Sequence, residues 1–118
     1  MYQTRPVSWI KAARRDFETF PQSVKVEVLR ALTVAAEGRK ADNAKPLHGL
    51  GSGIFEVMAS DRSDTYRVVY ALQIGDDIWV IHAFQKKSKK GIATPQSEIE
   101  LVRRRLKRAA ELDQKREH

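Results

Sequence analysis

The chain has 118 residues, no cysteine and a net charge of +7. A chain of this length suits one domain, so we expect a single domain over residues 1–118. The lack of cysteine excludes disulfides, thiolate catalysis and cysteine-type zinc sites. The histidines do not show the His-Glu-x-x-His spacing of a zinc site, so we expect no metal and no cofactor.

No apolar run approaches the roughly 20 residues that span a bilayer, and the N-terminus lacks the apolar core of a signal peptide. We therefore expect a cytoplasmic protein with no membrane partner. The charge is uneven along the chain: residues 1–85 hold 11 Lys and Arg against 10 Asp and Glu, and residues 86–118 hold 11 against 5. The basic last third predicts an anionic partner.

Two helices are expected first. Ser8 can cap a helix whose apolar residues repeat every three or four positions, and Pro21 suits the first turn of a second helix. Gly38 is suited to end this second helix. The apolar faces consist of Ile10, Ala13, Phe17 and Phe20, then Val24, Val28, Ala31, Leu32 and Ala35. The short break between them predicts a helical hairpin over one core.

Residues 39–53 contain Pro46 and three glycines and have no clear period, so we expect a loop. Residues 54–59, 66–72 and 78–85 alternate in strand fashion and are rich in β-branched and aromatic residues. The simplest topology is an antiparallel sheet of at least three strands with the helices on one face. Because helices and strands are segregated, the expected class is α+β.

The last helix is expected to begin near Thr94 and Pro95, a capping residue followed by proline. Its apolar face leaves four basic residues on the other side, namely Arg103, Arg104, Lys107 and Arg108. Residues 111–118 are expected to form a frayed tail.

Four lysines, Lys86, Lys87, Lys89 and Lys90, follow the third predicted strand directly. Their mutual repulsion would be relieved by a polyanion, and nucleic acid is the most abundant one in a cell. We predict that these lysines and the basic face of the last helix bind RNA. The alternative is a solvated lysine-rich turn.

Three further residues are candidates for chemistry. Arg67 closes an apolar row of its strand and can clamp a phosphate, or it can pair with Glu56 or Asp64 across the hairpin. His82 can transfer protons near neutral pH, or it can be a hydrogen-bonded histidine of the sheet. Glu56 can serve as a base or as a salt-bridge partner.

Several short motifs follow one another along nearly the whole chain. They are Lys45-Pro46-Leu47-x-Gly49-Leu50-Gly51, Phe55-Glu56, Tyr66-Arg67-Val68-Val69-Tyr70, His82-Ala83-Phe84-x-Lys86-Lys87-Ser88-x-Lys90 and Thr94-Pro95. This series resembles the phage-derived, HigB-like branch of the RelE/HigB type II toxin superfamily. The resemblance implies a compact α+β toxin fold. It also implies messenger RNA cleavage on the ribosome, and a helix-turn-helix antitoxin, encoded beside the toxin, as inhibitor.

The resemblance also implies roles for single residues. Arg67 matches the arginine that holds the scissile phosphate, Lys86 and Lys87 match a basic pair at the active face, and His82 matches a further site position. The implied reaction is attack of a ribose 2′-hydroxyl on the adjacent phosphate, which cations can support without a metal.

The chain lacks the late tyrosine that some relatives use, so the general base is left open. Two alternatives remain beside the RNA-cleaving toxin. One is a non-catalytic inhibitor of a protein target such as DNA gyrase, because some superfamily members act in that way. The other is a phage-derived nucleic-acid-binding module without toxicity.

Overall fold

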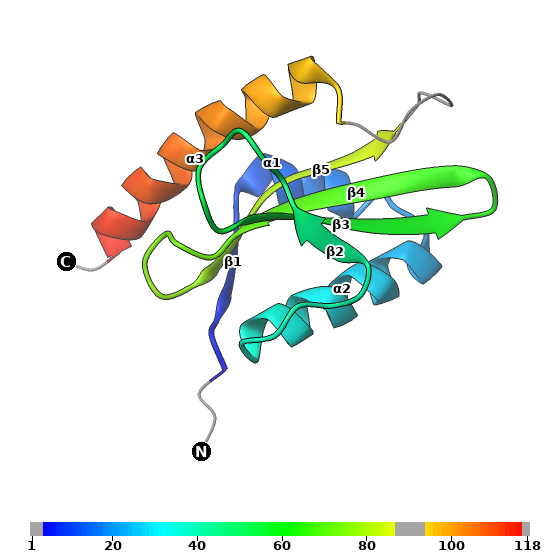
Figure 1. Ribbon diagram of the computed structural model, residues 1–118, viewed down its shortest axis with the longest axis horizontal. Helices are drawn as coiled ribbons and strands as arrows, with labels where there is room; N and C mark the ends of the chain where they lie inside the picture. Colours follow the sequence, from blue (N-terminus) through cyan, green and yellow to red (C-terminus); the bar gives the residue numbers. More distant parts are fainter. Residues whose placement is uncertain (1–3, 87–93, 117–118) are drawn as a thin grey trace.

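A computed structural model of the chain describes residues 4–86 and 94–116. The elements are β1 (Val7–Trp9), α1 (Lys11–Phe17), α2 (Gln22–Ala36), β2 (Ala44–Pro46), β3 (Ile54–Asp61), β4 (Asp64–Ala71), β5 (Ile78–Lys86) and α3 (Gln96–Arg116). The α+β class, the N-terminal helical hairpin, the antiparallel strands and the C-terminal helix are confirmed (Figure 1).

The strands form one five-stranded sheet in the order β1-β5-β4-β3-β2. Strands β2 to β5 are an antiparallel meander, and the short edge strand β1 runs parallel to β5. Ser8 lies in β1 and does not cap a helix, so that prediction was wrong. Its hydroxyl donates instead to the carboxylate of Asp77 at 2.5 Å. Strand β2 was also missed, inside the segment expected to be a loop.

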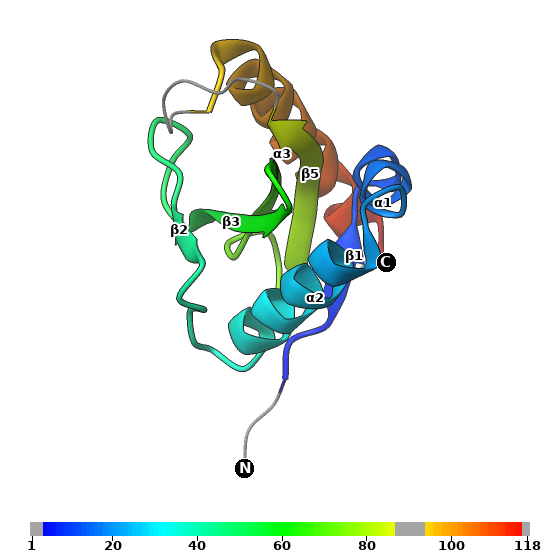
Figure 2. The ribbon, with the colours of Figure 1, turned by 90° about the vertical axis from the view of Figure 1, so that its right-hand side faces the viewer.

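The sheet lies between two layers of helix (Figures 1 and 2). Helix α2 covers one face of the sheet. On this face, the ring of Phe20, which precedes the helix, lies 4.8 Å from the ring of Tyr66. Helix α3 covers the other face, where the indole of Trp79 donates to Asp113 at 3.0 Å. The expectation of helices on one face only was therefore wrong, because α3 returns across the sheet after β5.

Helix α2 follows its sequence pattern closely. All five predicted core residues are buried, together with Ala36. The helix ends just before Gly38, as predicted, and Gly38 has a φ of +87°. The N–H of Gly38 donates to the carbonyl of Ala35, and the N–H of Arg39 donates to the carbonyl of Val34. This is a Schellman motif, which the left-handed conformation of Gly38 permits.

Helix α3 continues to Arg116, through most of the tail of residues 111–118 that was expected to fray, and residues 117–118 lie outside the described residues. Arg116 pairs with Asp77 at 2.7 Å and with Asp113 at 2.8 Å, and its guanidinium lies 5.4 Å from the Trp79 ring. Burial opposes ionisation of Asp77, but hydrogen bonds from Ser8 and Arg116 outweigh it and lower its pKa. No described helix is long and apolar enough to cross a membrane.

Candidate functional site

The strand register brings the candidate residues to one face of the sheet. In β4, Arg67 lies opposite Phe84 of β5. Two residues further along β4, Val69 lies opposite His82 of β5 on one side and Glu56 of β3 on the other. Residues two apart in a strand share a face, so Glu56, Arg67, His82 and Lys86 all lie on the face that α3 covers. These candidate residues therefore share one face, although they come from three strands.

A buried ion pair forms the centre of this face. The guanidinium Nη1 of Arg67 donates to Oε1 of Glu56 at 2.9 Å, and the side chains are 3% and 0% exposed. Thr94, which precedes α3, accepts a hydrogen bond from the same nitrogen at 3.2 Å and donates to the second oxygen of Glu56. Among the described residues, Nε of Arg67 has no hydrogen-bond partner. Of the two alternatives for Arg67, pairing with Glu56 is the arrangement in the free chain.

Two lysines surround this pair. Lys86, at the end of β5, is 9% exposed. Its pKa is lowered mainly by burial and also by repulsion from Arg67 and Lys45, whereas attraction from Glu56 acts in the opposite direction. The cluster of Lys45, Glu56, Arg67 and Lys86, which we call the cation cluster, thus holds three cations and one carboxylate. It is suited to bind an anion.

A hollow of about 450 Å³ opens beside the cation cluster. It is lined by Lys45, Pro46, Leu47, His48, Glu56, Thr94 and Ile99. Glu56 of the buried pair thus borders the hollow, and the loop between β2 and β3 forms one wall. Sequence reasoning did not place His48 or Lys45 at the site, because only the pairing of β2 with β3 brings them there.

His82 is held between two side chains of α3. Its Nδ1 lies 3.0 Å from Nη1 of Arg105, and its Nε2 lies 3.2 Å from Oε1 of Glu98. Arginine can only donate, so Nδ1 accepts and Nε2 carries the proton toward Glu98. Burial lowers the pKa of His82, and Arg105 adds to this, although the hydrogen bond that the ring donates to Glu98 opposes it. The neutral ring, stacked on Phe84 at 4.9 Å, thus has both nitrogens occupied.

The other predicted RNA-binding residues fall into two groups. Arg103, Arg104, Lys107 and Arg108 are all exposed on the outer side of α3, as the helical pattern predicts. Lys87, Lys89 and Lys90 lie outside the described residues. In the part of the chain that is described, no group of three potential metal ligands occurs.

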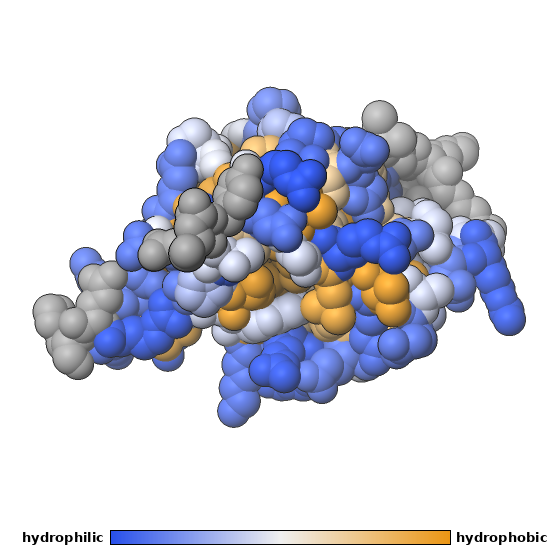
Figure 3. All heavy atoms as spheres, turned by 90° about the horizontal axis from the view of Figure 1, so that it is seen from below, coloured by the Kyte–Doolittle hydropathy of each residue, from blue (hydrophilic) through white to orange (hydrophobic). Residues whose placement is uncertain are grey.

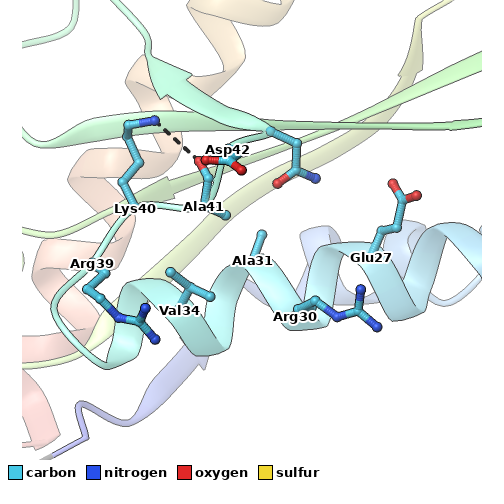
Figure 4. Close-up of a pocket in the computed structure, with 9 residues that line it drawn as sticks. Glu27, Arg30, Ala31, Val34, Arg39, Lys40, Ala41 and Asp42 are labelled. Atoms are coloured by element: carbon cyan, nitrogen blue, oxygen red, sulfur yellow. Dashed lines mark hydrogen bonds between the residues drawn. The ribbon is translucent and has the colours of Figure 1, made fainter.

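A second hollow, of about 470 Å³, lies on the opposite side of the sheet between α2 and residues 39–43 (Figure 4). Its floor includes Ala31 and Val34, and Arg30, Arg39 and Lys40 stand around it. The neighbouring surface exposes apolar side chains among charged ones (Figure 3), and Val26 and Leu29 of α2 are 44% and 47% exposed. Arg39 is paired with Glu37, and Lys40 donates to backbone carbonyls, so two of the three cations around this hollow are engaged within the chain.

The buried pair yields a stability prediction. Arg67→Ala should lower the free energy of unfolding by about 3 kcal/mol, because it leaves the Glu56 carboxylate buried without its partner. The double variant Glu56→Gln/Arg67→Met should recover most of this loss, since no uncompensated charge remains. Urea denaturation followed by circular dichroism measures both. Equal stability of Arg67→Ala and the wild type would contradict a stabilising role of the pair.

The environment of His82 yields a pH prediction. The pKa of His82 in the folded chain lies below its usual value of 6.5. As the pH falls, the histidine of the unfolded chain therefore becomes protonated before that of the folded chain. The stability that the neutral ring contributes is present above about pH 6.5 and is lost as the pH falls through the lower, folded pKa. His82→Gln, which can also donate to Glu98 and accept from Arg105, should lose this part of the acid sensitivity.

Glu98→Gln is the matched control for this effect. Glu98 raises the pKa of His82, so its removal should move the loss of stability to lower pH. Asp16 and Arg105 also act on the ring and are unchanged in both variants. Identical pH dependence of urea denaturation in the wild type and His82→Gln would show that this histidine does not titrate differently in the two states.

A family model and a solved structure match most of the chain. The family model described as "Phage derived protein Gp49-like (DUF891)" matches residues 15–107, whereas no curated protein matches the chain. A mutant of the Escherichia coli toxin RelE in the free state is similar at a TM-score of 0.61 and 18% identity, over 86% of this chain and 98% of that one. The Mycobacterium tuberculosis toxin–antitoxin complex RelBE2 gives a TM-score of 0.49 and 18% identity, over 75% and 100%. The chain belongs to the phage-derived Gp49-like family and has a RelE-like fold.

Proposed function

We propose that this chain is the toxin of a type II toxin–antitoxin system, of the HigB-like branch, and that it cuts messenger RNA on the ribosome. The observation that carries the proposal is the cation cluster, which gathers three cations around a single carboxylate beside an open hollow. The family match and the RelE-like fold support a toxin, and the basic last third of the chain supports an RNA substrate.

The proposed reaction is an internal transfer within the RNA. The ribose 2′-oxygen attacks the adjacent phosphorus, the O2′–P bond forms, and the P–O5′ bond breaks. The products are a 2′,3′-cyclic phosphate and a 5′-hydroxyl end. The proposed step needs no metal, because Arg67, Lys45 and Lys86 can stabilise the charge that develops on the phosphorane oxygens.

The described residues suit this chemistry in different ways. Nε of Arg67 is a buried donor without a partner among the described residues, and a phosphate oxygen would satisfy it. The pKa of Lys86 is lowered by burial and by Arg67, which makes its ammonium a better proton donor to the leaving 5′-oxygen. For His82, whose nitrogens are both engaged, we propose that it positions Glu98 and Arg105 rather than moving a proton.

The proposed partners follow from the same reading. The ribosome and its messenger RNA are the targets, and the exposed basic side of α3 would contact their phosphates. A helix-turn-helix antitoxin, encoded beside this chain, would hold the toxin inactive in a hetero-oligomer. This part of the proposal rests on the family resemblance.

RNA ends formed after induced expression test the activity. We expect growth to stop, translation to fall before DNA synthesis, and cut messenger RNA to carry 2′,3′-cyclic phosphate ends. The double variant Glu56→Gln/Arg67→Met should be folded and harmless, because its cluster has lost the guanidinium. Intact messenger RNA together with arrested DNA synthesis would reject RNA cleavage in favour of a gyrase-type target.

Salt dependence tests which basic surface meets RNA. Replacing Arg103, Arg104, Lys107 and Arg108 by Gln should weaken binding to ribosomes and flatten the dependence of affinity on salt, by about 0.7 in log–log slope for each lost phosphate contact. Replacing four exposed basic residues of the α1–α2 side, namely Lys11, Arg15, Arg30 and Arg39, removes the same charge. That control should change the slope little, and an equal change in both variants would exclude a specific role for α3.

A further inference from the structure

The hollow beside the cation cluster contains a titratable side chain that the reaction has not yet used. His48 lies in the loop between β2 and β3 and lines the hollow together with Lys45, Glu56 and Thr94. It is exposed, so an RNA sugar can reach its ring without displacing protein atoms. The loop is short and is held by backbone hydrogen bonds from Leu47 to Ile54 and from Leu72 to Gly53.

The other proton-transfer groups on this face are already engaged. Glu56 is fully buried and accepts hydrogen bonds from Arg67 and Thr94. His82 is occupied at both ring nitrogens by Glu98 and Arg105. Among the described residues that line the hollow, His48 is thus the imidazole that is exposed to solvent and can accept a proton.

We infer that His48 is the general base of the proposed reaction, taking the proton of the ribose 2′-hydroxyl as its oxygen attacks phosphorus. This inference rests on the proposed function. The electron pair of the O2′–H bond forms the O2′–P bond, and the proton passes to a ring nitrogen of His48. As the P–O5′ bond breaks, the leaving oxygen takes a proton from the Lys86 ammonium or from water, so atoms and charges balance.

The charged groups that share the hollow define the pH dependence. Lys45 reaches it from β2 and Glu56 from β3, whereas α3 contributes Ile99 and the preceding segment contributes Thr94. A general base works as the neutral imidazole, so the rate of cleavage should rise with pH. Glu56 is already paired with Arg67 and has no free oxygen to replace the histidine.

The test measures single-turnover cleavage of ribosome-bound messenger RNA by the full chain across pH. His48→Gln should slow the chemical step about 100-fold, as expected for a lost general base, and should remove the rise of rate with pH. His48→Ala should be partly restored by imidazole added to the buffer, since the hollow is open to solvent. Ser52→Ala, an exposed substitution in the same loop that lies outside the hollow, should cleave at the wild-type rate.

The outcomes separate this inference from the proposed function. If the wild type produces no cyclic phosphate ends, the proposed function fails. If the wild type cleaves and His48→Gln keeps both its rate and its pH profile, the role of His48 is overturned and the function stands. A slow His48→Ala that imidazole does not restore, with the pH profile unchanged, would assign the histidine to RNA binding and also overturn the inference.

Discussion

The architecture of the site depends on the burial of one ion pair. Removing Glu56 and Arg67 from water costs several kcal/mol for each charge, and only close pairing with further hydrogen bonds repays this. Thr94 supplies those bonds, because its hydroxyl accepts from Arg67 and donates to Glu56. The pair therefore fixes the register of β3 and β4 and the point at which the chain enters α3.

Helix α3 is fastened to the sheet at both ends, and this sets the environment of the residues between. Thr94 joins its start to the buried pair, and Arg116 and Asp113 join its end to Asp77 and Trp79. Gly75 belongs to the second contact: its φ is +61°, and a Cβ there would come within 2.1 Å of the Asp113 carboxylate. With both ends held, Glu98 of the first turn and Arg105 further along the helix lie against the two nitrogens of His82.

The sequence predicts what local patterns determine and misses what pairing determines. Helix α2 and strands β3 to β5 carry strong periodicities, and their core residues are buried as expected. Strands β1 and β2 have three residues each, too few for alternation to show, and only their hydrogen-bonded neighbours define them. The same holds for the candidate site. Arg67 and Lys86 were predicted from composition and resemblance, whereas Lys45 and His48 are placed at the site by the pairing of β2 with β3, which the sequence did not predict.

Under the proposed reaction, the charge of the cation cluster would let a buried arginine act on a phosphate. Lys45, Arg67 and Lys86 carry three positive charges and Glu56 carries one negative charge, so these four side chains sum to +2. A phosphodiester carries one negative charge, and a phosphorane formed by an ionised 2′-oxygen carries two. Under the proposed reaction, the cluster matches the transition state better than the bound substrate, which is the condition for catalysis. In this proposal, Glu56 limits the affinity of the cluster for an ordinary phosphodiester. Without Glu56, the same three cations would bind the substrate more strongly, and the additional stabilisation of the phosphorane would be smaller.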